Sequence, residues 1–282
     1  MIQERLKALR AEMEKRGITV YVVPTADFHE SEYVGDHFKA RKFITGFTGS
    51  AGTAVITLDE AGLWTDGRYF VQAENQLKDS TVTLYRMGEE GVPTVDEFVK
   101  DRLKEGGCLG FDGRVVNGTW GGKLEKIAAE KNVSMHVTED LIDLIWEDRP
   151  ALSKQPLFIL EEKYSGKSTA DKIADLRKAM KENGADVHIL TSLYDIAWLL
   201  NIRGNDIDYV PVVLSYLVLN ETECIWFLQE EVVDDKIRAY LEENHITTKP
   251  YDAIYDYVPE IPADAVVLMN RGTVNYRIVN SL

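Results

Sequence analysis

Cysteine and histidine are scarce in this chain of 282 residues, which contains two cysteines and five histidines. Cys108 and Cys224 each lie in an apolar, strand-like stretch, one in each half of the chain. We expect both to be buried free thiols in a reducing compartment, so a disulfide or a cysteine metal pair is disfavoured. The histidines are scattered, with no His-Glu-x-x-His spacing, and metal sites need convergent donors. The chain alone is therefore not expected to bind a metal ion or another cofactor.

Basic residues are also few, with 32 Lys and Arg against 47 Asp and Glu and a formal net charge of −15. A negative field repels phosphate backbones and anionic lipid surfaces, so nucleic acid and membranes are disfavoured as partners. No apolar run approaches the roughly 18–20 residues that span a bilayer. Residues 1–6 are charged and lack the apolar region of a signal peptide. We expect a cytoplasmic protein and interpret the acidic run 230–235 as solvated surface.

Two segments repeat each other at an offset of 167 residues, so that Leu9 corresponds to Leu176. Residues 9–17 and 176–184 share Leu, Arg, Met and Gly at equivalent positions, and an apolar stretch follows each. Each copy predicts a helix that ends at glycine and leads into a buried strand. With about two domains expected from the length and a boundary marked by Pro150 and Pro156, we predict an α/β fold. It would consist of two tandem domains, 1–155 and 156–282, each with a mixed sheet flanked by helices.

The remaining pattern supports this organisation. Thr94 followed by Glu97 has the spacing of a capping box and predicts a helix that runs to position 103. Residues 274–282 begin what looks like a further helix. The other predicted strands are 51–57, 62–66, 81–87, 108–111, 134–137, 187–191, 212–218, 223–228 and 265–269, and the other predicted helices are 68–77, 124–131, 194–200 and 236–244.

The densest glycine cluster is 46–52, with the sequence GFTGSAG. A phosphate-binding loop would need Lys-Ser or Lys-Thr after the glycines, and a dinucleotide site would need a helix there. A strand follows instead, and Thr48 occupies the position of the serine in a nucleophile elbow. We interpret the cluster as a tight turn that feeds a strand where another backbone approaches closely.

Polar residues gather at three other places. His29, Ser31 and Glu32 are too close in sequence to converge as a catalytic triad, and we interpret Ser31 as lying near a helix start. Nothing in the local pattern there needs Glu32. Asp66 and Arg68 either pair locally or form an exposed edge that meets another domain, and the sequence leaves both open.

A third polar segment, 201–206, follows an apolar helix. Gly204 is expected to end that helix. This would leave Arg203 and Asp206 exposed.

In their order along the chain, these motifs resemble the Xaa-Pro aminopeptidases (aminopeptidase P), in the branch with three domains. The resemblance covers essentially the whole chain. The matching blocks are HESEY at 29–33, RKFITGFTGSAGTA at 41–54, LWTDGRYF at 63–70, IWEDRP at 145–150 and DIAWLLNIRGND at 195–206.

The resemblance implies two creatinase/prolidase N-terminal-type domains with a ribonuclease H-like fold. In this family a third, "pita-bread" domain follows and binds two metal ions, commonly manganese, through Asp, Asp, His, Glu and Glu. This chain ends where that domain would begin and carries none of those ligands. We therefore expect it to contain no catalytic residue and to be inactive alone. The parent protein would be a metallo-exopeptidase that removes the N-terminal residue preceding proline.

The family also implies partners: the C-terminal catalytic domain of the same protein, a second subunit in a homodimer, and a peptide with proline at its second position. Glu32 becomes the best candidate to contact a substrate ammonium group or a partner subunit, because a carboxylate suits a cation by charge-assisted hydrogen bonding. The residues expected at a substrate site or subunit contact are His29, Glu32, Tyr33, Arg68, Arg203 and Asp206.

Other functions stay open at this stage. The chain could be a self-contained binding or assembly module without chemistry. It could belong to a prolidase or creatinase-type hydrolase, although those relatives typically carry one such N-terminal domain. A ribonuclease H-like fold also makes a nuclease a candidate. However, the negative net charge disfavours binding of a nucleic acid substrate, and the clustered carboxylates that would hold its metal ions are lacking.

Overall fold

A computed structural model describes residues 1–282 and shows two compact units. Unit 1 comprises Met1–Asp27 and Asp36–Ala151, and unit 2 comprises Phe28–Gly35 and Leu152–Leu282. The expected boundary at 155 lies four residues beyond the end of unit 1. The segment Phe28–Gly35, named here the 28–35 segment, follows the first strand of unit 1 but packs within unit 2.

Unit 1 is built on a six-stranded mixed sheet with the order β4-β3-β2-β1-β5-β6. The strand β1 pairs antiparallel with β2, and β2 pairs antiparallel with β3, whereas the other pairs are parallel. The strands are β1 (Val20–Pro24), β2 (Thr53–Thr57), β3 (Ala61–Thr65), β4 (Thr83–Arg86), β5 (Cys108–Phe111) and β6 (Ser134–His136).

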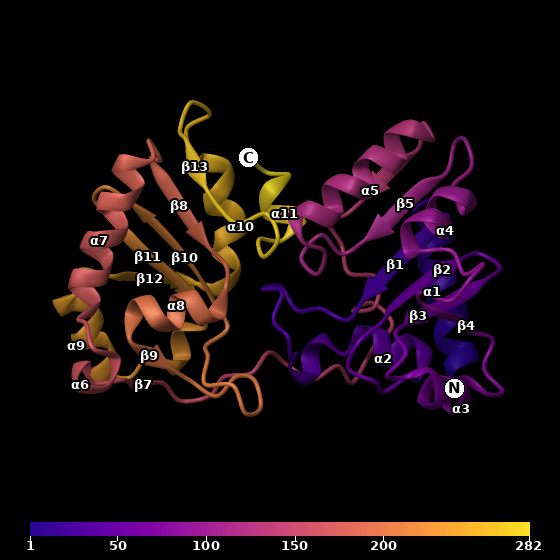
Figure 1. Cartoon of the computed structure of the whole chain (residues 1–282), viewed down its shortest axis with the longest axis horizontal. Coiled ribbons are helices and arrows are strands. Elements are labelled where there is room, and N and C mark those ends of the chain that lie inside the picture. The colour runs from indigo at the N-terminus through magenta and orange to yellow at the C-terminus, as the bar shows by residue number, and fades with distance from the viewer. The chain divides into compact units, whose positions relative to one another are not determined.

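Helices cover both faces of this sheet (Figure 1). Apolar side chains of α1, α2 and α3 share one core with β1, β2 and β3, and α4 packs against α5 on the other face. The helices are α1 (Ile2–Lys15), α2 (Ala40–Thr45), α3 (Phe70–Leu77), α4 (Val95–Arg102) and α5 (Gly118–Glu130), with a 3₁₀ turn at Asp36–Phe38.

Unit 2 has a five-stranded sheet with the order β12-β11-β10-β8-β13. Its parallel and antiparallel pairs follow the same order as those of β4-β3-β2-β1-β5 in unit 1. The strands are β8 (Val187–Leu190), β10 (Ser215–Asn220), β11 (Cys224–Leu228), β12 (Thr247–Pro250) and β13 (Val267–Leu268), with a separate pair β7 (Phe158–Ile159) and β9 (Ile202–Arg203). The helices are α6 (Glu162–Ser165), α7 (Thr169–Glu182), α8 (Leu193–Leu200), α9 (Asp235–Glu243), α10 (Ile254–Tyr257) and α11 (Tyr276–Val279), with 3₁₀ turns at Glu230–Val232, Tyr251–Ala253 and Val258–Glu260.

The two repeated segments form equivalent structures. Gly17 and Gly184 follow α1 and α7 in the left-handed conformation, at φ of 68° and 66°. Glycine adopts this conformation without steric cost, which is why it ends helices. Arg10 of α1 donates to the Thr57 carbonyl at the end of β2, and Arg177 of α7 donates to the Asn220 carbonyl at the end of β10. The prediction of two tandem α/β domains is confirmed.

Local signals placed some elements correctly and missed others. Thr94 and Glu97 form the predicted capping box at the start of α4. The helix predicted at 124–131 begins earlier, at Gly118, because the side chain of Asn117 accepts a hydrogen bond from the Trp120 amide. The helix start predicted near Ser31 is wrong, since the next helical residues begin at Asp36.

The interpretation of the 46–52 cluster is confirmed. Gly46 ends α2 in the left-handed conformation, at φ 78°. A Cβ atom added at Gly52 would lie 2.8 Å from the backbone oxygen of Trp64, so the close backbone approach excludes a side chain there. Arg41 stabilises the turn, because its buried guanidinium donates to the carbonyls of Phe47 and Gly49.

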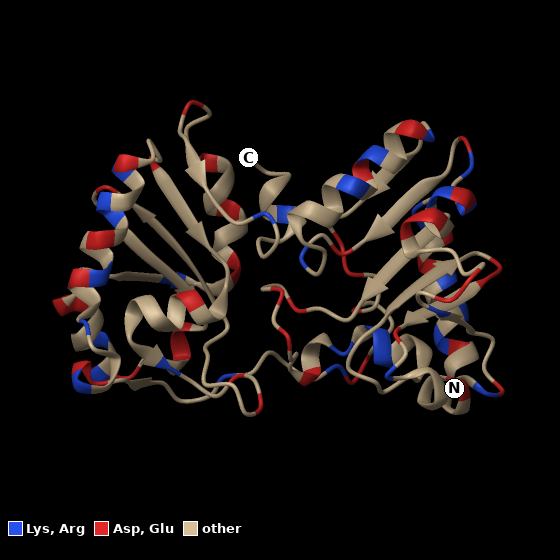
Figure 2. Cartoon of the chain, in the orientation of Figure 1, with Lys and Arg blue, Asp and Glu red and all other residues tan.

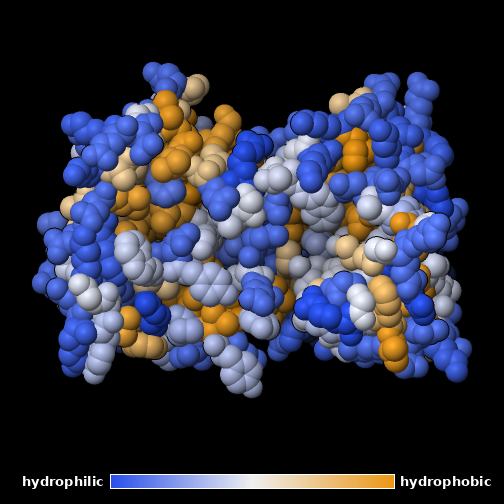
Figure 3. Space-filling view, in the orientation of Figure 1, coloured by the Kyte–Doolittle hydropathy of each residue, from blue (hydrophilic) through white to orange (hydrophobic).

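The surfaces of both units carry mixed charge, with acidic and basic side chains interspersed along α5 and α7 (Figure 2). The acidic side chains of the run 230–235 are exposed, as predicted. In unit 2, β13 is an edge strand, and Val266 and Leu268 leave hydrophobic surface beside it (Figure 3). No helix combines the length and the apolar character that crossing a bilayer requires.

Candidate functional site

The 28–35 segment begins with two buried residues that are held in unit 2. His29 is 2% exposed, and its Nδ1 lies 2.9 Å from the carbonyl oxygen of Thr191. Its Nε2 lies 2.6 Å from the hydroxyl of Tyr251. The His29 ring packs against Tyr216 and Tyr251, and Tyr216 in turn packs against Tyr255. These three tyrosines are named here the tyrosine cluster.

The end of the 28–35 segment is exposed. Glu30 adopts a positive φ of 57°, which turns the chain after His29. Glu32 is exposed and Tyr33 is 54% exposed, so both can meet a partner or a substrate. The structure thus separates the predicted site residues of this motif into a buried histidine and an exposed carboxylate and phenol.

Arg203 binds backbone carbonyls at the end of α8. The helix ends at Asn201, which is left-handed at φ 51°, so the prediction that Gly204 ends it is wrong. The guanidinium of Arg203 donates to the carbonyls of Ala197 and Ile202. A cation is favourable there because the last helical carbonyls carry partial negative charge. Burial lowers the pKa of Arg203 from its ordinary value.

The prediction that Arg203 and Asp206 are exposed is wrong. Asp206 is 8% exposed, and its two carboxylate oxygens accept from the backbone amides of Gln155 and Leu214, at 3.1 and 2.9 Å. Arg203 is half-buried. Burial raises the pKa of Asp206 while these hydrogen bonds oppose the shift. Asp206 therefore ties the start of unit 2 to the loop before β10.

Arg68 lies in unit 1 and pairs locally, which was one of the two readings that the sequence left open. Its Nε and Nη2 each lie 2.8 Å from an oxygen of Asp66, and the Arg68 side chain is 70% exposed. The guanidinium lowers the pKa of Asp66 to about 2. The Arg68 guanidinium also lies 5.3 Å from the centre of the Tyr69 ring.

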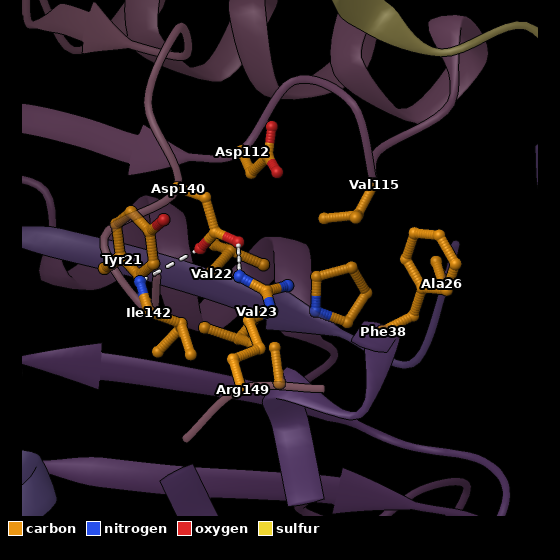
Figure 4. A pocket seen from close by; sticks show the side chains of 12 residues that line it. Tyr21, Val22, Val23, Ala26, Phe38, Asp112, Val115, Asp140, Ile142 and Arg149 are labelled. Atoms are coloured by element: carbon orange, nitrogen blue, oxygen red, sulfur yellow. Dashed lines mark hydrogen bonds and ion pairs between the residues drawn. The ribbon is translucent and has the colours of Figure 1, made fainter. Parts of the chain in front are cut away.

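Buried carboxylates of unit 1 surround a small cavity (Figure 4). Arg149 points at Asp140, with Nη1 2.6 Å from the carboxylate, and Asp112 lies on the opposite side. Burial raises the pKa of Asp112, although Arg114 opposes the shift. The cavity volume is about 10 Å³, which corresponds to roughly one water molecule. It is therefore too small to be a substrate site.

A larger hollow of about 360 Å³ lies in unit 1 beside α4 and α5. Its carboxylate, Asp96, accepts from the indole of Trp120 at 2.8 Å, and the rest of its lining is apolar or hydroxyl-bearing. No group of three His, Cys, Asp or Glu side chains in the chain is placed to hold a metal ion. The described residues thus do not fit a dinuclear metal centre.

Sequence reasoning missed the partners that hold the 28–35 segment. Asn275 is 2% exposed, and its Nδ2 donates to the carbonyl of Phe28 at 3.1 Å. Its Oδ1 accepts from the Ile278 amide and caps α11, just as Asn117 caps α5 in unit 1. Each asparagine stands three residues before the amide that it caps, and this spacing was a signal that could have identified Asn275 as a cap. Nothing in the pattern connects it to Phe28.

Comparison with known proteins gives a consistent result. The Creatinase/Prolidase N-terminal domain family matches the chain twice, over residues 5–145 and 148–282. A probable Xaa-Pro aminopeptidase P of Neurospora crassa is 41% identical over 255 residues, which cover 89% of this chain and 37% of that protein. A probable Xaa-Pro aminopeptidase P of Laccaria bicolor is 40% identical over an alignment of 296 positions, which covers 99% of this chain and 46% of that protein.

Among solved structures, the chain is similar to an X-prolyl aminopeptidase from Caenorhabditis elegans, described as a cytosolic enzyme with a di-nuclear active site. The TM-score is 0.93 at 32% identity, over 99% of this chain and 48% of that one. The chain spans less than half the length of these relatives. It belongs to the creatinase/prolidase N-terminal domain family, of which it carries two tandem copies.

Proposed function

We propose that this chain is the non-catalytic N-terminal portion of a cytoplasmic metallo-exopeptidase that removes the N-terminal residue preceding proline. The observation that carries the proposal is similarity to Xaa-Pro aminopeptidases over nearly the whole chain, at about 40% identity. The description of the Caenorhabditis elegans relative as cytosolic supports the compartment.

The chemistry belongs to a C-terminal catalytic domain with two divalent metal ions, which we propose are manganese. That relative is described as having a di-nuclear active site, whereas this chain offers no cluster of metal-binding side chains. In this proposal, the two tandem domains serve subunit assembly in a homodimer and shape the substrate site.

Glu32 is the residue that we propose meets the substrate ammonium group or a partner subunit. It is exposed at the end of an anchored segment. A carboxylate held in this way can accept charge-assisted hydrogen bonds from an N-terminal ammonium. Tyr33 and Arg68 are exposed and would contribute to the same kind of contact, whereas His29, Arg203 and Asp206 would support the site from buried or half-buried positions.

The test compares this chain with a longer polypeptide that continues into the catalytic domain, using a peptide with proline at its second position and added manganese. We expect the longer polypeptide to release the first residue and this chain to release none. Release by this chain would contradict the assignment of the chemistry to a C-terminal domain. A longer polypeptide that is folded but inactive would leave a binding or assembly module as the function.

The role of Glu32 is tested in the longer polypeptide with Glu32→Gln, which removes the charge and keeps the shape. A contact across a desolvated interface predicts a loss of about 2–5 kcal/mol in kcat/KM or in dimer affinity. Glu221→Gln is the matched control, because Glu221 is an exposed glutamate in the turn between β10 and β11 of the same unit. Equal kcat/KM and equal oligomer mass for both variants would show Glu32 to be an ordinary surface acid.

A further inference from the structure

We infer that unit 2 positions Glu32, and that His29 is a positioning residue that acts through it. The inference deepens the proposed function. It rests on that proposal only for the role of Glu32 as a contact to the substrate or to a partner subunit. The 28–35 segment begins four residues after β1 of unit 1, yet it packs within unit 2. The location of Glu32 would then be set by contacts that lie far away in the sequence.

The first contact fixes the His29 ring completely. The carbonyl oxygen of Thr191 can only accept a hydrogen bond, so Nδ1 at 2.9 Å must carry the proton. In the neutral ring, Nε2 is then an acceptor, and it accepts a hydrogen bond from the Tyr251 hydroxyl at 2.6 Å. Both ring nitrogens are thus engaged with partners in unit 2, which determines the tautomer and the orientation of the ring.

The tyrosine cluster holds the same ring on its face. The ring centroids of His29 and Tyr216 are 4.5 Å apart, and those of Tyr216 and Tyr251 are 5.1 Å apart. The hydroxyls of Tyr216 and Tyr255 lie 2.8 Å from each other, so the cluster is itself connected. A buried side chain in such packing has little rotational freedom.

Asn275 provides a second contact, and its Nδ2 also donates to the hydroxyl of Tyr255 in the tyrosine cluster, at 3.2 Å. Its Oδ1 must face the Ile278 amide, which can only donate, and its Nδ2 must face the Phe28 carbonyl, which can only accept. The assignment of the amide is therefore unambiguous. One side chain caps α11 and holds the backbone of the residue before His29.

These two anchors restrict where Glu32 can lie. Glu32 lies three positions after His29 in the sequence, and three residues of extended chain span at most about 11 Å. Glu30 is left-handed and already exposed, so the chain reaches the surface directly after the buried His29. Glu32 is thus tethered closely to unit 2 while its carboxylate remains exposed.

Hydrogen exchange of this chain tests the anchor without any reference to activity. We expect His29→Ala to accelerate exchange of the amides of residues 30–35 by about tenfold or more, since a buried hydrogen-bonded group is lost. Tyr251→Phe keeps the aromatic packing and removes one hydrogen bond, so it should give a smaller acceleration. His29→Asn, which can still donate to Thr191, should restore part of the protection.

His188→Ala is the matched control, because His188 also donates from Nδ1 to a carbonyl in unit 2, that of Leu268, at 2.9 Å. It should leave exchange at residues 30–35 unchanged. If residues 30–35 exchange at the wild-type rate in both His29→Ala and Tyr251→Phe, while circular dichroism shows an intact fold, His29 does not anchor the segment.

A double-mutant cycle in the longer polypeptide tests the link to Glu32. If His29 acts through Glu32, His29→Ala should lower kcat/KM in the wild-type background by at least about tenfold and have little further effect in the Glu32→Gln background. Fully additive effects would overturn the positioning role. If Glu32→Gln itself leaves kcat/KM unchanged, the proposed role of Glu32 fails, while the exchange experiment still decides the anchor.

Discussion

Lys172 offers the sharpest test of how unit 2 is stabilised, because it is a buried cation whose hydrogen-bond partners are uncharged. The residue lies on α7 and is 2% exposed. Its Nζ donates to the carbonyl of Trp198 at 2.7 Å and to Oδ1 of Asn201 at 2.6 Å. It also lies 4.5 Å from the centre of the Trp198 ring. We predict that Lys172→Met destabilises unit 2.

Two opposing effects set the magnitude of the loss. Each carbonyl left without a donor in a buried environment costs about 1–3 kcal/mol. Methionine fills a similar volume and removes a charge whose burial was itself unfavourable, which offsets part of that cost. Asn201 adds to the loss, because its left-handed conformation needs support from its surroundings. The free energy of unfolding of unit 2 should fall by about 2 kcal/mol.

The loss of stability caused by Lys172→Met should become larger as pH rises. Burial, followed by the charges of Arg203 and Lys167, lowers the pKa of Lys172 from 10.5. The unfolded chain therefore binds the proton more tightly, and the stability of the wild type rises with pH in the window below 10.5. The variant lacks this rise, so the stability difference between wild type and Lys172→Met should widen with pH.

Urea unfolding followed by tryptophan fluorescence measures the difference, with Lys178→Met as the control. Lys178 lies on the same helix, but its side chain is 76% exposed and its nearest ion-pair contact, with Glu182, is 3.9 Å. The control should change stability by less than about 0.5 kcal/mol. If both variants unfold at the same urea concentration, or if the difference narrows as pH rises, the reasoning about the buried cation is wrong.

Two smaller predictions concern the buried cysteines and the pair of Arg68 with Asp66. Burial raises the pKa of Cys224 to about 12, and Cys108 is buried too; a thiol reagent at pH 8 should therefore modify neither residue until the chain is unfolded, and rapid native modification would contradict the burial. Arg68→Ala should raise the pKa of Asp66 from about 2 toward 3.8, as measured by NMR titration. The contribution of this pair to stability is present above pH 3.8 and is lost as pH falls through about 2, so an unchanged Asp66 pKa in the variant would refute the pairing.

The sequence predicted helix ends and caps correctly where the residues that fix them lie within a few positions of each other. The glycines at 17 and 184 follow helices because a left-handed residue is needed within a few positions of the helix end. The capping box of Thr94 and Glu97 acts over three residues. The α5 start failed for a related reason: its first turn is rich in glycine and shows no apolar stripe, although Asn117 caps it.

The environment of the predicted site residues could not be derived in the same way. Asp206 was expected at the surface, but the amide of Gln155, 51 residues away in the sequence, helps to bury it. Arg203 was expected to be available to a partner, but its guanidinium donates hydrogen bonds to backbone carbonyls at the end of α8. A polar residue beside glycine is typical of an exposed loop, and only tertiary packing decides otherwise.

The sequence by itself determined the duplicated α/β architecture, the absence of a metal-binding pattern and the family to which the motifs point. The architecture and the lack of a metal-binding pattern follow from composition and from periodicity within single elements, whereas the family rests on the resemblance of the motifs. Tertiary structure alone decided which unit holds the 28–35 segment, because the two hydrogen-bond partners of His29 lie 162 and 222 residues away. A hydrogen bond between residues so far apart in the sequence closes a long loop, so no short-range pattern can encode it.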